Sequence, residues 1–472
     1  MTKNSQQKKQ ISNLLGKYKF DFVTKNKAFF QSKKGLTEET IKEISKRKNE
    51  PKWMTEYRLK ALEIFKQKPL PTWGPDLSEI NFEDIFYYLQ PQDSGKKTWG
   101  EVPQEIQYAF KKIGIQTAEK KFLGGVGAQF ESEMIYHSLK NDLAKKGVIF
   151  ESTENGLQKY PDLFKEFFGK VVPANDNKFA ALNSAIWSGG SFIYIPKGLK
   201  IELPLQAYFR INAEKMGQFE RTLIIADEGA EAHYVEGCTA PLYSTTSLHS
   251  AVVEIIVKKD ARIQYTTIQN WSHNIYNLVT KRAHVYKNAE MLWLDCNIGS
   301  KQTMKYPAIY LMGEGAKGEV QSLAFAGKNQ NQDTGVKIFH LAPNTKSKIV
   351  SKSISKDNGI NTYRGIIKVP KNSKNAKSHI SCNALLLDKN SRSDTFPKIQ
   401  IEEDDVSIEH EATVSRIGEE QLFYMMARGL SEEEAKSTIT NGFAEPIIKK
   451  LPMEYALELN RLLEIEFTDG VG

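Results

Sequence analysis

The sequence contains only three cysteines among 472 residues, Cys238, Cys296 and Cys382. So few thiols exclude a disulfide framework, and they also exclude a metal site built from four cysteines of one chain. They are typical of proteins from a reducing compartment.

Long apolar runs are also missing. No stretch of about 18 apolar residues occurs, so the sequence predicts no membrane-spanning helix. The first twenty residues are rich in lysine and glutamine and lack the apolar segment of a secretory signal. Lysine far outnumbers arginine, which indicates an AT-rich genome. We expect a cytoplasmic protein of a bacterium, or a protein of the plastid stroma if it is plastid-encoded.

Basic blocks interleaved with aromatic residues are absent too. The net charge is +8, but basic and acidic side chains alternate, as in residues 42–50. Specific nucleic-acid binding requires clustered cations, so we expect no nucleic-acid partner. The glycine-rich residues 124–127 lack the following Lys-Ser/Thr pair of a phosphate-binding loop, and we interpret them as a turn before a helix. We therefore expect no nucleotide site in this chain.

Residues 1–165 are predicted to form a mostly helical N-terminal region. Thr37 occupies an N-cap position, and two glutamates follow it in the first turn. Apolar residues at helical spacing predict further helices at 57–65, 103–113 and 131–146.

The pattern changes over residues 166–400, where short runs of β-branched and aromatic residues follow one another. Similar small turns separate the runs, each containing one alanine or threonine: Ala230, Ala261, Ala289, Ala316, Thr345 and Ala376. The steps between these positions are 31, 28, 27, 29 and 31 residues. A repeat of this length in a strand-rich region predicts a solenoid, in which stacked units share one core. A long meandering sandwich with similar turns is the alternative.

Residues 401–472 are predicted to form a C-terminal helical region. Gly418 precedes a helical pattern at 419–428. Ser431 and Glu434 occupy the two positions of a capping box at the start of a second helix. A last amphipathic helix is predicted at 453–465. Phe443, Ile447 and Ile448, which precede it, face either a partner protein or the end of the solenoid.

One candidate site combines a cysteine with residues about one repeat later. Cys382 lies near His379, and Glu409, His410 and Glu411 follow about 30 residues on. Thiolate, imidazole and carboxylate groups are all usable iron ligands. One solenoid turn apart, they would lie on neighbouring strands. The alternative is a buried thiol beside an exposed acidic turn.

The other cysteines and several polar residues leave alternatives open. Cys238 lies at a predicted turn, where a thiol of lowered pKa would be a reachable nucleophile; otherwise it is a small core residue. We interpret Cys296, within a strand, as core. Four residues of the strand-rich segments either face solvent or make the solenoid interior polar: Arg210, Asn212, Gln269 and Trp271.

Several longer blocks of sequence carry a family resemblance. They are residues 49–51, 189–196, 208–212, 217–222, 236–241, 393–397, 410–414 and 451–456. Together they resemble the SufB/SufD family of iron–sulfur cluster assembly proteins, from about residue 18 to the end. The Asn-Glu-Pro block and the Gly-Cys-Thr-Ala-Pro block favour the SufB branch over the SufD branch.

The resemblance implies a fold and a set of partners. The fold is mainly β: a right-handed parallel β-helix core flanked by helical regions at both ends. The C-terminal region would dock the SufC ATPase, and the core would pair with SufD or with a second SufB. The protein would be a scaffold without its own nucleotide site, so ATP hydrolysis is expected on SufC.

The resemblance also implies roles for single residues. Cys238 would accept sulfur as a persulfide from a cysteine desulfurase through a SufE-type carrier. Polar positions of the interior, suggested as a sulfur path, correspond to Arg210, Asn212, Gln269, Trp271 and Lys287.

The positions that would hold the nascent cluster correspond to Cys382, Glu409, His410 and Glu411, with Cys382, His410 and Glu411 as the metal ligands. The cofactors implied are a transient iron–sulfur cluster and reduced flavin in the complex. The Cys-x-x-Cys-type motif found near the N-terminus of some members is missing here.

Two other functions compete with the scaffold. Some proteins with a β-helix are enzymes that act on sugars, although no conspicuous carboxylate pair stands out in the repeat. A purely structural partner of SufC, closer to SufD, is the second competitor.

Overall fold

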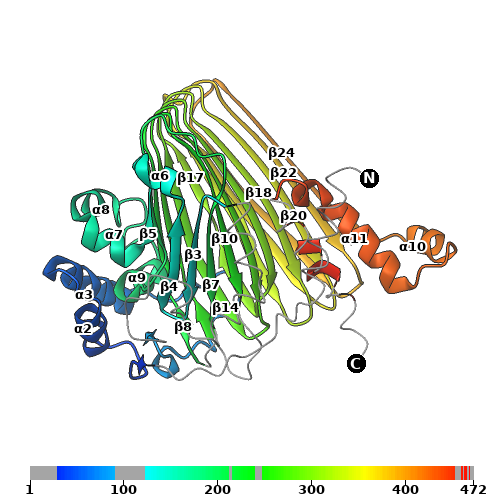
Figure 1. The fold of residues 1–472 in the computed structure, drawn as a ribbon. Coiled ribbons are helices and arrows are strands. Elements are labelled where there is room, and N and C mark those ends of the chain that lie inside the picture. Colours follow the sequence, from blue (N-terminus) through cyan, green and yellow to red (C-terminus); the bar gives the residue numbers. More distant parts are fainter. Residues whose placement is uncertain are drawn as a thin grey trace.

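The computed structural model describes residues 29–90, 123–211, 215–239 and 247–451, and scattered positions between 456 and 467. Two long, mostly parallel sheets lie against each other and form a solenoid, with helices at both ends (Figure 1). The expected fold, mainly β with a parallel β-helix core and terminal helices, is confirmed.

The first sheet has ten strands. In spatial order they are β24 (Val406–Arg416), β22 (Ala376–Leu386), β20 (Lys346–Ser355), β18 (Lys317–Ala326), β15 (Glu290–Gly299), β13 (Arg262–Trp271), β10 (Glu231–Thr239), β7 (Leu205–Arg210), β3 (Gly125–Phe130) and β4 (Glu133–Leu139). Only the pairing of β3 with β4 is antiparallel.

The second sheet has twelve strands. Its main path is β23 (Arg392–Ile401), β21 (Ile360–Val369), β19 (Asn331–His340), β16 (Gln302–Lys305), β14 (Ile275–Val285), β12 (Val252–Val257), β9 (Arg221–Ala226), β6 (Ser191–Ile195) and β5 (Ile149–Ser152), with β17 (Ala308–Leu311), β11 (Ser247–His249) and β8 (Gly217–Gln218) beside it. A separate pair joins β1 (Phe30–Gln31) to β2 (Leu89–Gln90).

The chain passes alternately between the two large sheets, and each turn of the solenoid adds a strand to each. In the ten-stranded sheet, Glu231 pairs with Arg262, Arg262 with Glu290, and Glu290 with Lys317. These offsets equal the steps counted between the turns of the sequence. The predicted solenoid is therefore correct, and the alternative of a meandering sandwich is wrong.

The repeated turns have a common conformation. The residue before each turn alanine or threonine has a positive φ: Gly229, Asp260, Asn288, Gly315, Asn344 and Asn375. Glycine, asparagine and aspartate adopt this left-handed conformation most readily. The alanine or threonine that follows is buried in every one of these turns. The sequence repeat thus arises from one turn that needs a left-handed residue and then a small one.

Helices cover the N-terminal end of the solenoid and part of the outer face of the ten-stranded sheet. At the N-terminal end lie α2 (Glu38–Arg47), α3 (Lys52–Gln67), the 3-10 turn η1 (Phe82–Asp84), α6 (Asn141–Lys145), α7 (Thr153–Lys159), α8 (Pro161–Phe167) and α9 (Lys178–Ile186). After β24 come α10 (Glu419–Met426) and α11 (Glu432–Ile448), and α11 packs against the outer face of the ten-stranded sheet. The Thr37 N-cap of α2 and the Ser431–Glu434 capping box of α11 are confirmed.

Two N-terminal predictions are wrong. Residues 131–146 contain β4 and the short helix α6 instead of one helix, because residues 133–139 pair with β3. Of the glycine-rich residues, 125–127 belong to buried β3 and Gly124 directly precedes it, so they form no turn before a helix. A Cβ on Gly125 would lie 2.8 Å from the Phe150 ring and 3.0 Å from the Ser138 carbonyl oxygen. The helix predicted at 103–113 lies outside the described residues.

The solenoid also extends beyond the range 166–400 on both sides. Strands β3, β4 and β5 precede it, and β24 follows it. The acidic residues 402–405 form the turn between β23 and β24 instead of opening a helical region. Of the helix predicted at 453–465, only part belongs to the described residues.

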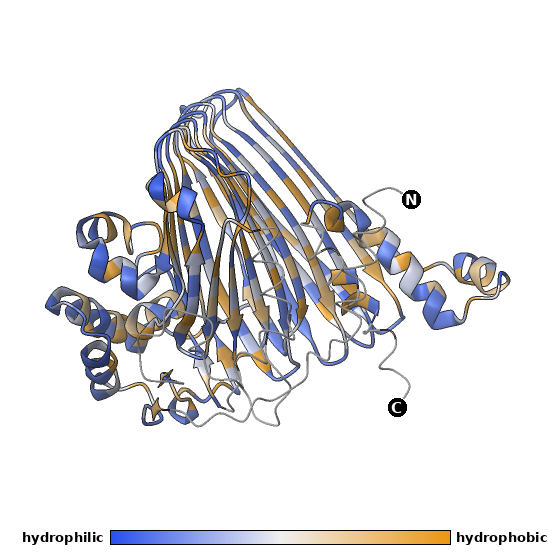
Figure 2. Ribbon diagram, in the orientation of Figure 1, coloured by the Kyte–Doolittle hydropathy of each residue, from blue (hydrophilic) through white to orange (hydrophobic). Residues whose placement is uncertain are grey.

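The main hydrophobic core lies between the two sheets, and a second core lies between the ten-stranded sheet and the C-terminal helices. Hydrophilic and hydrophobic residues alternate along many strands (Figure 2), as expected for strands with two different faces. Among the described residues, the helices are all too short or too polar to cross a bilayer.

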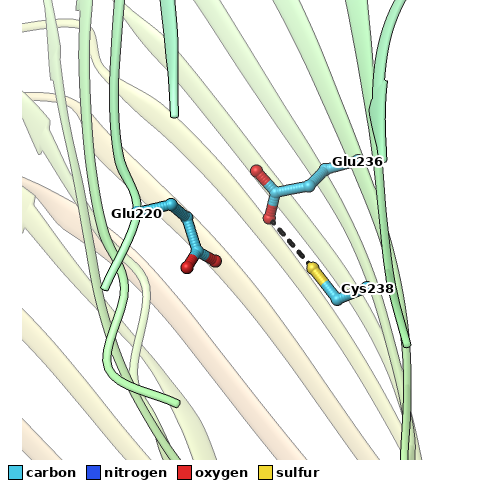
Figure 3. Close-up of side chains that lie close together, drawn as sticks. All are labelled: Glu220, Glu236 and Cys238. Carbon is cyan, nitrogen blue, oxygen red and sulfur yellow. Dashed lines mark hydrogen bonds between the residues drawn. The ribbon is translucent and has the colours of Figure 1, made fainter. Parts of the chain in front are cut away.

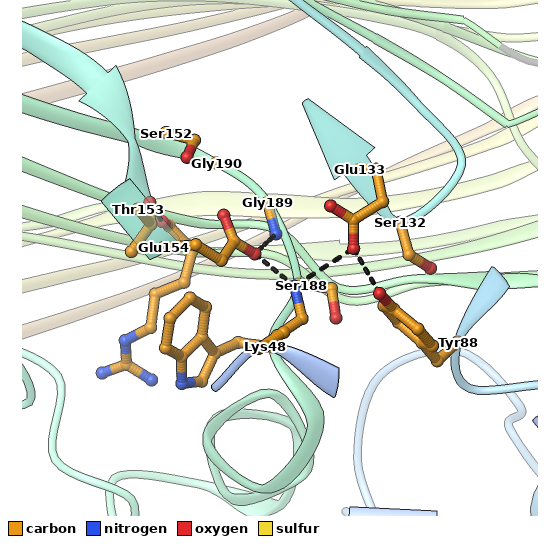
Figure 4. A network of polar contacts seen from close by, with 12 residues as sticks. Lys48, Tyr88, Ser132, Glu133, Ser152, Thr153, Glu154, Ser188, Gly189 and Gly190 are labelled. Carbon is orange, nitrogen blue, oxygen red and sulfur yellow. Dashed lines mark hydrogen bonds and ion pairs between the residues drawn. The ribbon is translucent and has the colours of Figure 1, made fainter. Parts of the chain in front are cut away.

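A buried charge network joins the N-terminal helices to the solenoid (Figure 4). Lys48, at the end of α2, lies with its Nζ 2.5 Å from Glu154 Oε1 and 3.5 Å from Glu133 Oε1. Tyr88 donates a hydrogen bond to Glu133, and the Gly189 amide donates one to Glu154. Because these residues come from separate segments, the network fixes the helices against β4 and α7.

Candidate functional site

A row of polar residues crosses the ten-stranded sheet. Register places Glu236, Thr267, Asp295, Ser322, Ser351 and Cys382 side by side on successive strands. The residues two positions before them belong to the core between the sheets: Tyr234, Tyr265, Trp293, Val320, Ile349 and Ile380. Because alternate residues of a strand share a face, the six polar residues also face that interior. We call them the interior row.

Two carboxylates accompany the thiol near the start of this row. Cys238 and Glu236 lie on β10, and Glu220 directly precedes β9 of the other sheet. Their ligand atoms all lie within 4.8 Å of one another, and all three residues are buried (Figure 3). The Cys238 thiol donates to Glu236 Oε1 at 3.8 Å. We call these three residues the Cys238 cluster.

Cys238 does not lie at a turn, and its pKa is not lowered. Burial raises the pKa of the thiol well above its usual range, and the charges of Glu236 and Glu220 raise it further, whereas Lys281 and Lys305 oppose them. Burial also raises the pKa of Glu236, against the effect of Lys281. Of the two alternatives left open for Cys238, the reachable thiol of lowered pKa is therefore wrong in this conformation, and the buried core residue is correct. In this conformation Cys238 is a protonated thiol whose hydrogen-bond acceptor is a carboxylate.

A chain of hydrogen bonds leads from this cluster through His249. Its Nε2 lies 2.5 Å from Glu220 Oε1, and its Nδ1 lies 2.7 Å from Asn277 Oδ1. The orientation of the Asn277 amide follows from its Nδ2, which donates to Gln269 Oε1. Both ring nitrogens thus face oxygens that can only accept. His249 therefore links Glu220 to Asn277 and, through Asn277, to Gln269.

The same network ends on a buried lysine. Lys305 donates to Gln269 Oε1 at 3.2 Å and to Asp295 Oδ1 at 2.9 Å. Burial lowers the pKa of Lys305 to about 8, and the Asp295 charge opposes this shift. Burial alone would raise the pKa of Asp295, but the charges of Lys305 and Lys281 outweigh it and lower that pKa. The solenoid interior is therefore both polar and charged.

The suggested path residues differ in their surroundings. Gln269 and Trp271 are buried on β13, and the His249 ring lies 4.5 Å from that of Trp271. Arg210 is buried at the end of β7. Lys287 is not in the interior: it lies in an exposed turn, with its Nζ 3.2 Å from Glu314 Oε2. The turn that repeats along the solenoid directs it outward.

Two further residues that the sequence analysis singled out have different outcomes. Asn212 lies outside the described residues. Cys296 is buried and belongs to the core on the outer side of the same sheet, as predicted. The sequence analysis missed the charged residues of the interior: Glu220, Glu236, His249, Lys281, Asp295 and Lys305. One signal in the sequence could have predicted them: a polar residue that takes a core position in the alternation of a strand. Asp295, two residues after Trp293, is an example.

The second candidate site lies near the open end of the solenoid. Burial raises the pKa of Cys382 to about 12, and the Tyr363 hydroxyl opposes this shift. His410 pairs with Ile380 and therefore faces the interior, as Cys382 does. The His410 Nε2 is buried without a hydrogen-bond partner among the described residues.

The carboxylates of this second group point the other way. Glu409 pairs with His379, and Glu411 pairs with Ser381, so both lie on the outer face of β24. Glu409 is mostly exposed, and its Oε2 lies 3.2 Å from His379 Nδ1. The fold thus brings Cys382 and His410 to one face, and it places Glu409 and Glu411 on the other.

Comparisons with known proteins agree over almost the whole chain. The family model for the SufBD core domain of SUF-system FeS cluster assembly matches residues 209–443, and that for the SufBD protein N-terminal region matches residues 34–207. An iron–sulfur cluster assembly SufBD family protein of Staphylococcus aureus (strain USA300) is 59% identical over 458 residues, which cover 97% of this chain and 98% of the relative. One from Staphylococcus haemolyticus (strain JCSC1435) is 58% identical over the same shares.

Proposed function

Because the chain belongs to the SufBD family of iron–sulfur cluster assembly proteins, we propose that it is a scaffold that receives persulfide sulfur and assembles a nascent cluster for transfer to apoproteins. Sulfur enters at Cys238, and the cluster forms around Cys382. The observation that carries this proposal is the interior row, which begins beside Cys238 and ends at Cys382. At about 4.8 Å between neighbouring strands, the row spans roughly 24 Å.

The entry step is a thiol–persulfide exchange. Once a rearrangement exposes the buried thiol, the Cys238 sulfur attacks the outer sulfur of a persulfide on a SufE-type carrier, which a cysteine desulfurase has loaded. The new S–S bond forms on Cys238, the old one breaks, and the carrier leaves as a thiolate. The Cys238 proton passes to Glu236, whose Oε1 accepts from the thiol. Release of the sulfur as sulfide needs two electrons, which reduced flavin in the complex would supply.

Of the residues that the resemblance suggests for the sulfur path, our proposal retains those that lie in the interior of the solenoid. Gln269 and Trp271 line it beside the hydrogen-bonded Lys305 and Asp295. Arg210 stands at the end of β7, which pairs with β10. We leave Lys287 out of the path because it is exposed.

The nascent cluster would be held by Cys382 and His410 from the interior face. Glu409 and Glu411 would join only through a rearrangement of β24 or from the side of a partner. Mixed thiolate, imidazole and carboxylate ligands bind iron less firmly than four thiolates, which suits a cluster that must leave.

Exposed surfaces at the C-terminal end support our assignment of the partners. On α10, Phe423, Tyr424 and Met426 are 74%, 58% and 43% exposed. We assign this helix to the SufC ATPase, on which ATP would be hydrolysed. SufD or a second copy of this chain would pair with the last strands. The bacterial relatives favour a bacterial cytoplasm over the plastid stroma.

The test is anaerobic assembly in the complex with SufC and SufD, supplied with cysteine, desulfurase, carrier and Fe²⁺. Sulfur loading is measured as the mass added to the intact chain, and cluster formation by absorption and Mössbauer spectra. Cys238→Ser is expected to lose loading from the desulfurase but to keep assembly from free sulfide. Cys382→Ala is expected to keep loading and lose the cluster.

Cys296→Ser is the matched control, because Cys296 is equally buried but lies in the core on the outer side of the sheet. It is expected to change neither readout. Normal loading of Cys238→Ser would contradict the entry role. An unchanged cluster in Cys382→Ala would contradict the assembly role, and the absence of any cluster in the wild-type complex would favour a purely structural partner of SufC.

A further inference from the structure

We propose that the Cys238 cluster is a binding site for a divalent transition-metal ion, and that Fe²⁺, which cluster assembly consumes, is the ion it takes. The ligands are one carboxylate oxygen of Glu220, one of Glu236 and the sulfur of Cys238. This site is separate from the group around Cys382.

The three ligand atoms converge from two sheets. Glu236 and Cys238 are two residues apart on β10, so both face the interior, and Glu220 approaches from the opposite sheet (Figure 3). All ligand atoms lie within 4.8 Å of one another. This is the spacing at which one ion can draw three donors into its coordination sphere with small side-chain movements.

One of these oxygens is buried without a partner. Glu220 is 1% exposed, and its Oε2 has no hydrogen-bond partner among the described residues. Its other oxygen is bonded to His249, which is held in turn by Asn277. A buried unpaired carboxylate oxygen is costly, and a bound cation removes that cost. His249 then acts as the outer partner that orients a ligating carboxylate.

The choice of ion follows from the donors. Carboxylates alone would suit Mg²⁺ or Ca²⁺, but a thiolate favours a softer first-row ion such as Fe²⁺, Co²⁺ or Zn²⁺. On binding, the metal–sulfur bond replaces the S–H bond, and the proton leaves to solvent without any change of oxidation state. The charge of Lys281 acts to lower the pKa of both Glu236 and Cys238, so Lys281 offsets part of the negative charge that the ligands carry.

Cys238 also takes part in the proposed sulfur entry, so a Cys238 variant cannot distinguish that role from metal binding. Glu220 has no part in sulfur entry, and its substitution therefore tests the metal site separately. The probe is anaerobic Co²⁺, because a cobalt–thiolate bond gives a charge-transfer absorption band that reports the cysteine directly. Bound cobalt is counted by mass spectrometry of the desalted protein. The full-length chain is titrated, and circular dichroism and melting confirm that each variant is folded.

The wild-type chain is expected to bind one Co²⁺ with a thiolate band. Glu220→Gln keeps the acceptor for His249 and removes the charge, and it is expected to weaken binding by at least about tenfold. Glu231→Gln, an exposed carboxylate at the start of the same strand, is the matched control and is expected to change nothing. Cys238→Ser is expected to abolish the band, and Cys382→Ala to leave it.

Other results would overturn the site. The absence of a thiolate band in the wild-type chain would show that no metal binds to Cys238. A band that depends on Cys382 alone would place the metal at Cys382 instead. Normal Co²⁺ binding by Glu220→Gln would show that Glu220 is not a ligand of the ion. Sulfur loading of Glu220→Gln by the desulfurase, measured in parallel, shows whether sulfur entry survives independently of the metal.

Discussion

Asp295 stands beside two lysines that are as deeply buried as itself. Its carboxylate lies 2.8 Å from the Nζ of Lys305 and 3.7 Å from that of Lys281, and it also accepts a hydrogen bond from Thr267. Each of these charges would be costly to bury alone. The lysines remain in the solenoid interior because this carboxylate is present, so its removal tests how firmly the charged interior is held.

Asp295→Asn is expected to lower the free energy of unfolding by about 3–5 kcal/mol, because it removes the carboxylate that forms ion pairs with two buried lysines. Urea unfolding followed by circular dichroism measures the change. Glu290→Gln is the control on the same strand: Glu290 forms only a partly exposed ion pair with Arg262, so its loss should cost less than about 1 kcal/mol. Equal effects of both variants would contradict the assigned role.

The cost of Asp295→Asn should also depend on pH. The pKa of Asp295 is lowered by folding, so its contribution to stability is complete above the pKa of an unfolded aspartate, about 3.9, and is lost as the pH falls below that value. The difference in unfolding free energy between wild type and variant should therefore shrink on acidification below about pH 4. A difference that stays constant there would show that Asp295 titrates normally.

At the scale of elements, β23 and β24 are the terminal strands of the two sheets. Several of their apolar side chains are exposed: Phe396, Ile399, Ile401 and Val414. An exposed edge strand with apolar residues is a ready surface for pairing with another chain. This is the surface that we assign to SufD or to a second copy of the chain.

The double variant Ile401→Lys/Val414→Lys is expected to weaken this pairing at least about tenfold, because two charges would be buried at the contact. Analytical ultracentrifugation of the chain alone and with SufD measures it. Met312→Lys places a charge on an equally exposed apolar residue away from the terminal strands and should leave pairing unchanged. Unchanged pairing of the double variant would mean that the partner binds elsewhere.

At the scale of the whole molecule, each solenoid turn contacts chiefly its neighbours. The turns at the N-terminal end are covered by helices and by the Lys48 network, whereas the last turn has a neighbour on one side only. Stability should therefore fall toward β23 and β24.

Hydrogen exchange measured by mass spectrometry tests this gradient. Amides of β23 and β24 are expected to exchange at least about tenfold faster than those of β13 and β15, and SufD should slow the terminal strands selectively. Uniform protection along the solenoid would contradict the gradient and indicate one cooperative unit.

The solenoid could be predicted from the sequence because the conformation of each turn depends on residues that are adjacent in the chain. A left-handed residue followed by a small one recurs in each turn, and a local requirement leaves a visible period. The Cys238 cluster leaves no such period, because Glu220 and Glu236 come from opposite sheets and meet only through the fold. Lys287 shows the same limit: its position in a turn, and not its charge, decides that it faces solvent.

The interior row also constrains how such a chain can change in length. Its residues stand on successive strands, so the separation between Glu236, the hydrogen-bond partner of Cys238, and Cys382 is a whole number of strand spacings. Inserting or deleting one complete turn of about 30 residues would alter that separation by about 4.8 Å and leave both helical ends intact. A partial insertion would instead break the register of every following strand. Evolution or engineering can therefore adjust the reach of the interior only in discrete steps.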